Sequence, residues 1–76
     1  MSATLSPYLL AEDVAARLGL SVGTVREYAR SGTIPHLKRS GSRRLLFRAD
    51  ELEAWEHGAD LILEELPRGG RRVRPL

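Results

Sequence analysis

The sequence predicts a small α+β fold, mostly helical, and three observations carry that prediction. Two short amphipathic segments are separated by a tight turn, a basic stretch with a Gly-Ser tip follows, and an acidic amphipathic segment comes next. A chain of 76 residues holds one thin core. Hydrophobic residues make up 42% and charged residues 29%, a globular balance.

The first helix is predicted over residues 11–18. Leu10, Val14 and Leu18 recur at intervals of four, which places them on one helical face. Gly19 follows the last of them and can adopt the left-handed conformation that closes a helix.

The second helix is predicted over residues 22–30. Ser21 precedes it as an N-cap, and Gly32 stands where the helix should stop. The turn between the two helices is therefore only three to four residues long. The inward stripe of the second helix consists of Val22, Val25 and Ala29.

A β-hairpin with a basic tip is predicted after Pro35, which forbids a continued helix. Residues 37–39 and 44–47 would be its strands, with 40–42 as the turn. Leu45 and Phe47 alternate with Arg44, Leu46 and Arg48, so one face can pack on the core while the arginines face outward.

A third helix is predicted to begin near Ala49. Its apolar residues are spaced 3, 4, 3 and 4 apart, which favours a helix continuing through Gly58 to residue 65 or 66, before Pro67. A break at 57–58 is the competing possibility. We expect residues 1–66 to form one domain and 67–76 a basic flexible tail. The apolar stripe consists of Leu52, Trp55, Ala59, Ile62 and Leu66.

The charges are sorted along the chain. The net charge of +2 is the sum of −1 over residues 1–25, +6 over 26–48, −7 over 50–65 and +4 from residue 68 onward. A polyanion responds to a local patch more than to the sum, so the basic middle segment indicates nucleic acid as the partner. The alternative is a solvated charge run.

A catalytic function is not expected, and no cofactor or metal is predicted. The chain has no cysteine, and its two histidines, His36 and His57, lack metal-ligand spacing. No phosphate loop or nucleophile elbow is present. No apolar run approaches membrane-spanning length, so we expect a cytoplasmic protein without a membrane partner.

The second helix and the hairpin are the predicted DNA-binding surface. An α-helix fits the major groove, and a basic hairpin tip reaches neighbouring phosphates. Arginines on the exposed helical face can donate to guanine or to phosphate, and small residues at the helix start permit close approach. The predicted contact residues are Ser21, Val22, Gly23, Thr24, Arg26, Arg30, Lys38, Arg39, Ser40, Ser42, Arg43 and Arg44. For Val22 and Val25 the alternative is core packing.

Several segments together resemble the excisionase-like branch of the MerR-type winged helix-turn-helix superfamily. They extend from residue 8 to about 56 and include the helix-turn-helix with Val14–Ser21, the Arg30–Pro35 segment, the basic wing, and Phe47 followed by 50–55. The resemblance implies a two-stranded wing, a C-terminal packing helix and sequence-specific binding of double-stranded DNA. Ala11 stands where the family usually has a Ser or Thr N-cap, and Val22, Gly23 and Arg26 depart from its usual pattern. The base preference is therefore not carried over.

The resemblance also implies a role. Excisionase-like proteins of phages and mobile elements are architectural recombination directionality factors that bend DNA and direct an integrase. Partners would be duplex DNA and an integrase. The −7 and +6 segments further indicate head-to-tail association of successive copies, and symmetric pairing of two subunits through Ala59, Ile62 and Leu66 is the alternative. A small MerR-like transcription regulator is the alternative. A protein-interaction module, an adaptor or antirepressor using Leu61, Leu63 and Leu66, is the alternative from another class.

Overall fold

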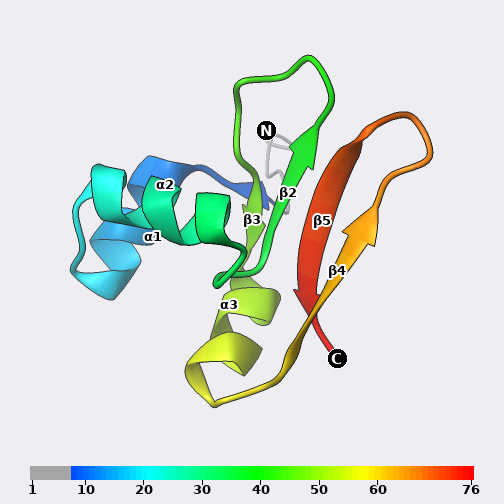
Figure 1. The fold of residues 1–76 in the computed structure, drawn as a ribbon. Coiled ribbons are helices and arrows are strands. Elements are labelled where there is room, and N and C mark those ends of the chain that lie inside the picture. Colours follow the sequence, from blue (N-terminus) through cyan, green and yellow to red (C-terminus); the bar gives the residue numbers. More distant parts are fainter. Residues whose placement is uncertain (1–7) are drawn as a thin grey trace, which may run out of the picture.

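The computed structural model describes residues 8–76, so residues 1–7 of the predicted domain lie outside the described part. Three helices and five short strands make up a small α+β fold (Figure 1). No helix in this part is long and apolar enough to cross a membrane. The elements are β1 (Tyr8–Leu9), α1 (Ala11–Leu18), α2 (Val22–Ser31), β2 (His36–Arg39), β3 (Phe47–Arg48), α3 (Ala49–Glu56), β4 (Leu61–Glu65) and β5 (Gly70–Pro75).

Helix α1 has the predicted bounds, but its N-cap is Leu10 and not Ala11. The Leu10 side chain has no oxygen that could accept from a backbone N–H of the first turn. Instead the Asp13 carboxylate reaches back to the cap, where its Oδ2 accepts from the Leu10 backbone N–H at 2.9 Å. Gly19 closes the helix with φ at 71°.

Helix α2 also agrees with its prediction to within one residue. The Ser21 hydroxyl accepts from the Thr24 backbone N–H at 3.1 Å, and Gly32 closes the helix in the left-handed conformation. Val25 and Ala29 are buried, whereas Val22 is half-buried against the core. The helix-turn-helix is therefore built from the predicted caps and the predicted apolar stripe.

Helix α3 is shorter than the favoured prediction, which was wrong beyond Glu56. His57 caps the helix, and Gly58 turns the chain with φ at 90°, so the competing break at 57–58 is the one that occurs. Residues 61–65 form strand β4 and do not continue the helix. The apolar spacing misled because an alternation of 3 and 4 over a short segment also fits two separate elements.

The expected flexible tail was wrong for residues 70–75. They form β5, the central strand of a three-stranded antiparallel sheet with the order β2-β5-β4. On one side His36 pairs with Val73, and on the other Leu63 pairs with Val73. Arginine-rich sequence forms a strand here because Val73 is buried and because the arginines find partners in other elements.

The predicted wing is present in a changed form. Strand β2 and Leu46 share one bridge, in which Leu37 and Leu46 exchange two backbone hydrogen bonds of 2.8 and 3.0 Å. After that bridge β3 leaves β2 and pairs with β1, and residues 40–45 form a loop longer than the predicted tip. The ladder of β2 is completed instead by β5.

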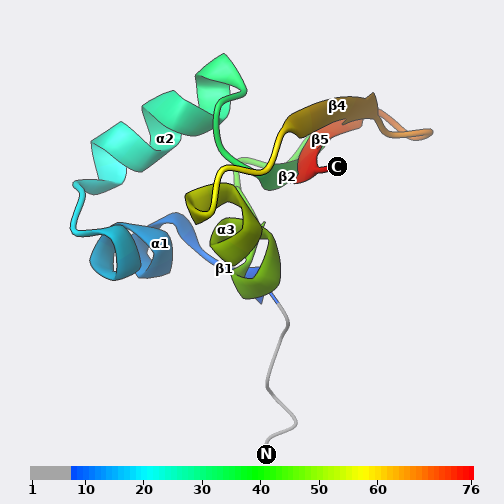
Figure 2. The ribbon, with the colours of Figure 1, turned by 90° about the horizontal axis from the view of Figure 1, so that it is seen from below.

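The core lies among the helices and β3. Figure 2 shows α1 and α2 on one side, the β2-β5-β4 sheet on the other, and α3 between them. Phe47, Ile34 and Leu52 are its largest fully buried apolar side chains. Trp55, expected in the core, is half-buried at its border and meets Tyr28 edge-on, with ring centroids 6.5 Å apart.

Candidate nucleic-acid interface

A basic cleft separates α2 from the wing. Its volume is about 580 Å³, and its lining contains six cationic side chains and no acidic one. Helix α2 contributes two of them, β2 and the following loop three, and β5 one. The lining residues are Arg26, Ala29, Arg30, Lys38, Arg39, Ser40, Arg43, Leu45, Gly70 and Arg71. The cleft thus brings together six of the twelve predicted contact residues.

Arg44 lies at a second hollow beside the first. It shares this smaller site with Arg26 and Arg43, which also line the main cleft. Glu12 of α1 is the acidic residue of its lining. Ser42 shapes the same loop, since its hydroxyl accepts from the Arg44 backbone N–H at 3.1 Å.

The remaining predicted residues lie at the start of α2 and outside the cleft. Ser21 and Gly23 are exposed, while Val22 and Thr24 are half-buried. The hydroxyls of Ser21 and Thr24 lie 2.9 Å apart and are hydrogen-bonded to one another. These residues form the N-cap and first turn of the helix whose later residues Arg26 and Arg30 line the cleft.

Arg71 is the cleft residue that sequence reasoning missed. Its Nη2 donates to the carbonyls of Ala29 and Arg30, the latter at 3.0 Å, at the C-terminal end of α2. A cation there satisfies the Arg30 carbonyl, adds a second donor to the Ala29 carbonyl beside the Gly32 N–H, and complements the helix dipole. A signal was present in the sequence: Pro67 to Gly70 is turn-forming and lies between two segments of strand length.

His36 is fully buried behind the cleft and touches Arg71. Arg71 Nε donates to His36 Nε2 at 3.3 Å, and the other ring nitrogen lies 2.8 Å from the Ile34 carbonyl. Burial lowers the pKa of His36, and the charge of Arg71 lowers it further, although the bond to Ile34 acts in the opposite direction. The imidazole is therefore neutral at pH 7.

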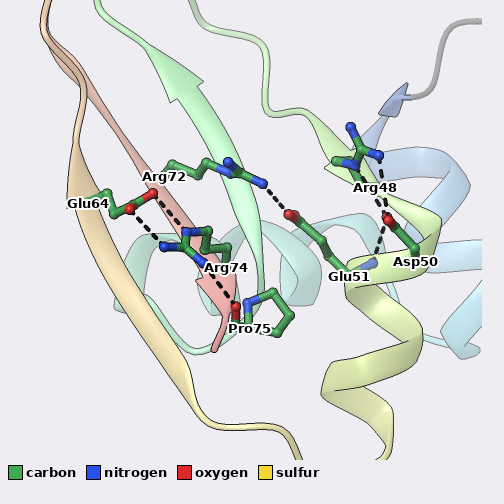
Figure 3. A network of polar contacts seen from close by, with 7 residues as sticks. All are labelled: Arg48, Asp50, Glu51, Glu64, Arg72, Arg74 and Pro75. Carbon is green, nitrogen blue, oxygen red and sulfur yellow. Dashed lines mark hydrogen bonds and ion pairs between the residues drawn. The ribbon is translucent and has the colours of Figure 1, made fainter.

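The acidic segment is largely neutralised within the chain. Figure 3 shows Arg72 donating to Glu51, Arg74 donating to Glu64, and Arg48 donating to Asp50. The Arg74 guanidinium lowers the pKa of the Glu64 carboxyl, and Arg48 lowers that of Asp50. The arginines of β5 thus neutralise carboxylates of α3 and β4. In the cleft, Arg30 is paired with Glu27 of the same helix at 3.0 Å.

No arrangement for metal chemistry is found among residues 8–76: no three His, Asp or Glu side chains there converge. His36 is committed to Arg71 and Ile34, and His57 is exposed at the end of α3. What the arrangement offers chemically is a concave cationic surface that can accept phosphates.

Comparison with known proteins agrees with this geometry. No curated protein and no solved structure matches the chain. A family model described as a helix-turn-helix domain matches residues 8–58, more than half of the chain, and that family includes excisionase-like DNA-binding domains. A helix-turn-helix domain suggests sequence-specific DNA binding. The match ends just after α3, so β4 and β5 lie beyond it. The chain belongs to this helix-turn-helix domain family.

Proposed function

We propose that this protein binds double-stranded DNA with α2 in the major groove and the wing on adjacent phosphates, and that it is an architectural factor of the excisionase type. The basic cleft between α2 and the wing is the observation that carries the proposal. Arg26 and Arg30 face it from the helix, and Lys38, Arg39 and Arg43 face it from the wing.

The elements that follow α3 favour the architectural role over a MerR-like regulator. Such regulators dimerise through a long helix after the DNA-binding domain. Here the chain turns at Gly58 and folds back as the β4–β5 hairpin on the wing. In this proposal the protein binds as single domains that lie side by side along a bent duplex, next to an integrase.

Selection from random duplexes tests the function. The purified protein is incubated with the pool at moderate salt, and the bound fraction is sequenced and followed by mobility shift. Evenly spaced repeats with stepwise shifts support an architectural factor, whereas one inverted repeat indicates a dimeric regulator. If no sequence is enriched, specific DNA binding is contradicted and a protein partner is favoured. Such a partner would contact Leu63 on β4, which is 53% exposed and is the most exposed apolar residue of the hairpin strands.

Substitution of Arg30, Arg43 and Arg44 by alanine is the matched test of the surface. We expect loss of binding to the selected duplex, because these side chains are exposed at the proposed interface. Arg17→Ala is the control, since Arg17 faces Glu56 of α3 at 3.6 Å. If four to six phosphates are neutralised, the logarithm of the binding constant falls with the logarithm of the salt concentration with a slope on the order of −4 to −5.

Head-to-tail association between neighbouring copies is the remaining part of the proposal. Four acidic residues of the 50–65 segment have arginine partners within the chain: Asp50, Glu51, Glu56 and Glu64. Glu53 is exposed on α3 and is the cleaner site for charge reversal, because reversal at Glu56 also breaks its pair with Arg17. If the DNA-binding curve of Glu53→Arg is as steep as that of the wild-type protein, the head-to-tail contact is overturned.

Excision itself is assayed with an integrase. An integrase is incubated with its recombined attachment sites, and the yield of excised product is measured with and without the protein. Stimulation together with DNA bending, measured by energy transfer between duplex ends, supports the directionality role. Specific DNA binding without either effect supports the transcription regulator instead.

A further inference from the structure

The cationic side chains of the described residues divide into two groups. Six arginines are engaged with carboxylates or helix carbonyls: Arg17, Arg30, Arg48, Arg71, Arg72 and Arg74. Within residues 8–76, six others have side chains without a hydrogen bond or ion pair: Arg26, Lys38, Arg39, Arg43, Arg44 and Arg68. Five of these six are predicted DNA contacts, and the sixth is Arg68.

Arg68 stands apart from the other arginines of the C-terminal segment. Arg72 and Arg74 are paired with Glu51 and Glu64, and Arg71 is bound to the end of α2. An exposed arginine is often only solvated, but here the neighbouring cations of the same hairpin are all used to hold the fold. Arg68 is the one left over in residues 61–76.

The turn that carries Arg68 has a defined geometry. Residues 66–69 form a turn in which the Gly69 N–H donates to the Leu66 carbonyl at 3.0 Å, and Leu66 N–H donates to the Gly70 carbonyl at 3.1 Å. Pro67 occupies the second position, where its ring fixes φ. Arg68 is exposed at the third position.

This turn lies against the wing loop. The Ser40 N–H donates to the Gly69 carbonyl at 3.4 Å, and a Cβ added at Gly69 would lie 2.8 Å from the Ser40 Cβ. Arg39 and Arg68 line one shallow hollow, with Leu66, Pro67 and Gly69. Figure 1 shows the β2–β3 loop and the β4–β5 turn at the same end of the molecule.

We propose that the β4–β5 turn is a second tip of the wing, which contacts DNA beyond the surface formed by residues 8–58 and places Arg68 on a phosphate flanking the one held by Arg39. The inference rests on the proposed DNA binding. Arginine suits this place because its planar fork binds phosphate oxygens, and the Gly69–Ser40 contact keeps both tips together. The bound site is accordingly longer than the helix-turn-helix alone would cover.

The salt dependence of binding tests the proposal. The duplex selected with the wild-type protein is titrated with Arg68→Ala from low to moderate salt. Loss of one phosphate contact lowers the magnitude of the log-log slope by about 0.9 and weakens binding by up to about fivefold. Arg68→Lys keeps the charge and is expected to keep the slope.

Footprinting locates the contact. Ethylation interference with the wild-type protein is expected to show a phosphate at the flank that Arg68→Ala no longer requires, while the phosphates facing α2 are unchanged. Arg17→Ala is the matched control and should leave slope and footprint as in the wild type, because Arg17 faces α3.

The outcomes separate the two proposals. If the wild-type protein binds and Arg68→Ala has the same slope and footprint, the second tip is overturned and the proposed function stands. If the wild-type protein enriches no duplex, both are overturned. Circular dichroism shows whether Arg68→Ala is folded. If Arg68→Ala is partly unfolded, its smaller salt slope supports the phosphate contact only when Arg68→Lys has the wild-type slope. A folded Arg68→Lys that also has the smaller slope overturns the phosphate contact.

Discussion

Arg71 and His36 hold each other in one hydrogen-bonding state. Arginine can only donate, so Arg71 Nε–H requires His36 Nε2 to be the acceptor. The proton of the neutral ring is then on Nδ1, which donates to the Ile34 carbonyl at 2.8 Å. A strand at the C-terminal end thereby fixes the tautomer of a buried histidine and, through the same guanidinium, the last turn of α2.

The buried histidine makes stability depend on pH. The pKa of His36 is lowered from its ordinary 6.5 by burial, so between the folded and unfolded values the unfolded chain binds the proton and the folded one does not. Stability is complete above about pH 7.5 and falls as the pH decreases below about 6.5.

Urea unfolding across this pH range measures the effect. His36→Gln keeps an acceptor for Arg71 and removes the titrating group, so we expect a flatter profile between about pH 7.5 and 5. His57→Gln is the matched control, because His57 is exposed, and should retain the wild-type profile. Equal profiles for wild type and His36→Gln would contradict the assignment.

Replacement of Arg71 by methionine should destabilise the protein. The apolar stem is kept while the donors to Ala29, Arg30 and His36 are lost. The Arg30 carbonyl and His36 Nε2 are then left without this partner, whereas the Ala29 carbonyl keeps the Gly32 N–H. The expected loss is about 2 kcal/mol in the free energy of unfolding. Arg68→Met is the control and should change it by less than about 0.5 kcal/mol. Chemical unfolding at pH 7 compares them.

Gly70 and Gly58 form a matched pair for substitution by alanine. Both have positive φ, 94° and 90°, so alanine is strained at each. At Gly70 the new Cβ would also lie 2.8 Å from Arg39 Cα, whereas at Gly58 it meets open space. We expect Gly58→Ala to cost about 1 kcal/mol and Gly70→Ala clearly more. Thermal unfolding gives the order, and equal costs would mean that β2 and β5 are not so closely apposed.

The Glu51–Arg72 pair should contribute more than the exposed ion pairs. The Glu51 side chain is 14% exposed, compared with 70% for Asp50 in its pair with Arg48. A double-mutant cycle with alanine is expected to give a coupling energy above about 1 kcal/mol for Glu51–Arg72 and below it for Asp50–Arg48. The reverse order would show that α3 and β5 are not coupled through this bond.

The parts of the fold that could be predicted are those set by nearby residues. Ser21 and Gly32 bound α2 because caps act within one turn, and Phe47 is buried because strand alternation is local. The six predicted contact residues of the cleft come from two such local elements, α2 and the wing, which the fold brings together.

The remainder depends on distant partners. Strand β5 is stabilised by β2, more than thirty residues away in sequence, and by ion pairs to α3 and β4, none of which a local pattern reports. For the same reason the sequence predicts Arg71 to lie in a flexible tail: its role appears only when the sheet brings it to the end of α2.

The central position of β5 has a consequence for how the molecule is made. The sheet requires residues 70–75 between β2 and β4, so β2 cannot pair in this sheet until β5 has been synthesised. The residues that cap α1 and α2 are all synthesised earlier. Helix α2 and both of its caps are thus synthesised before Arg71, which binds the C-terminal end of that helix. Cleavage within 70–75 would open the wing from its middle, leaving two unpaired edges where the intact chain has a continuous ladder.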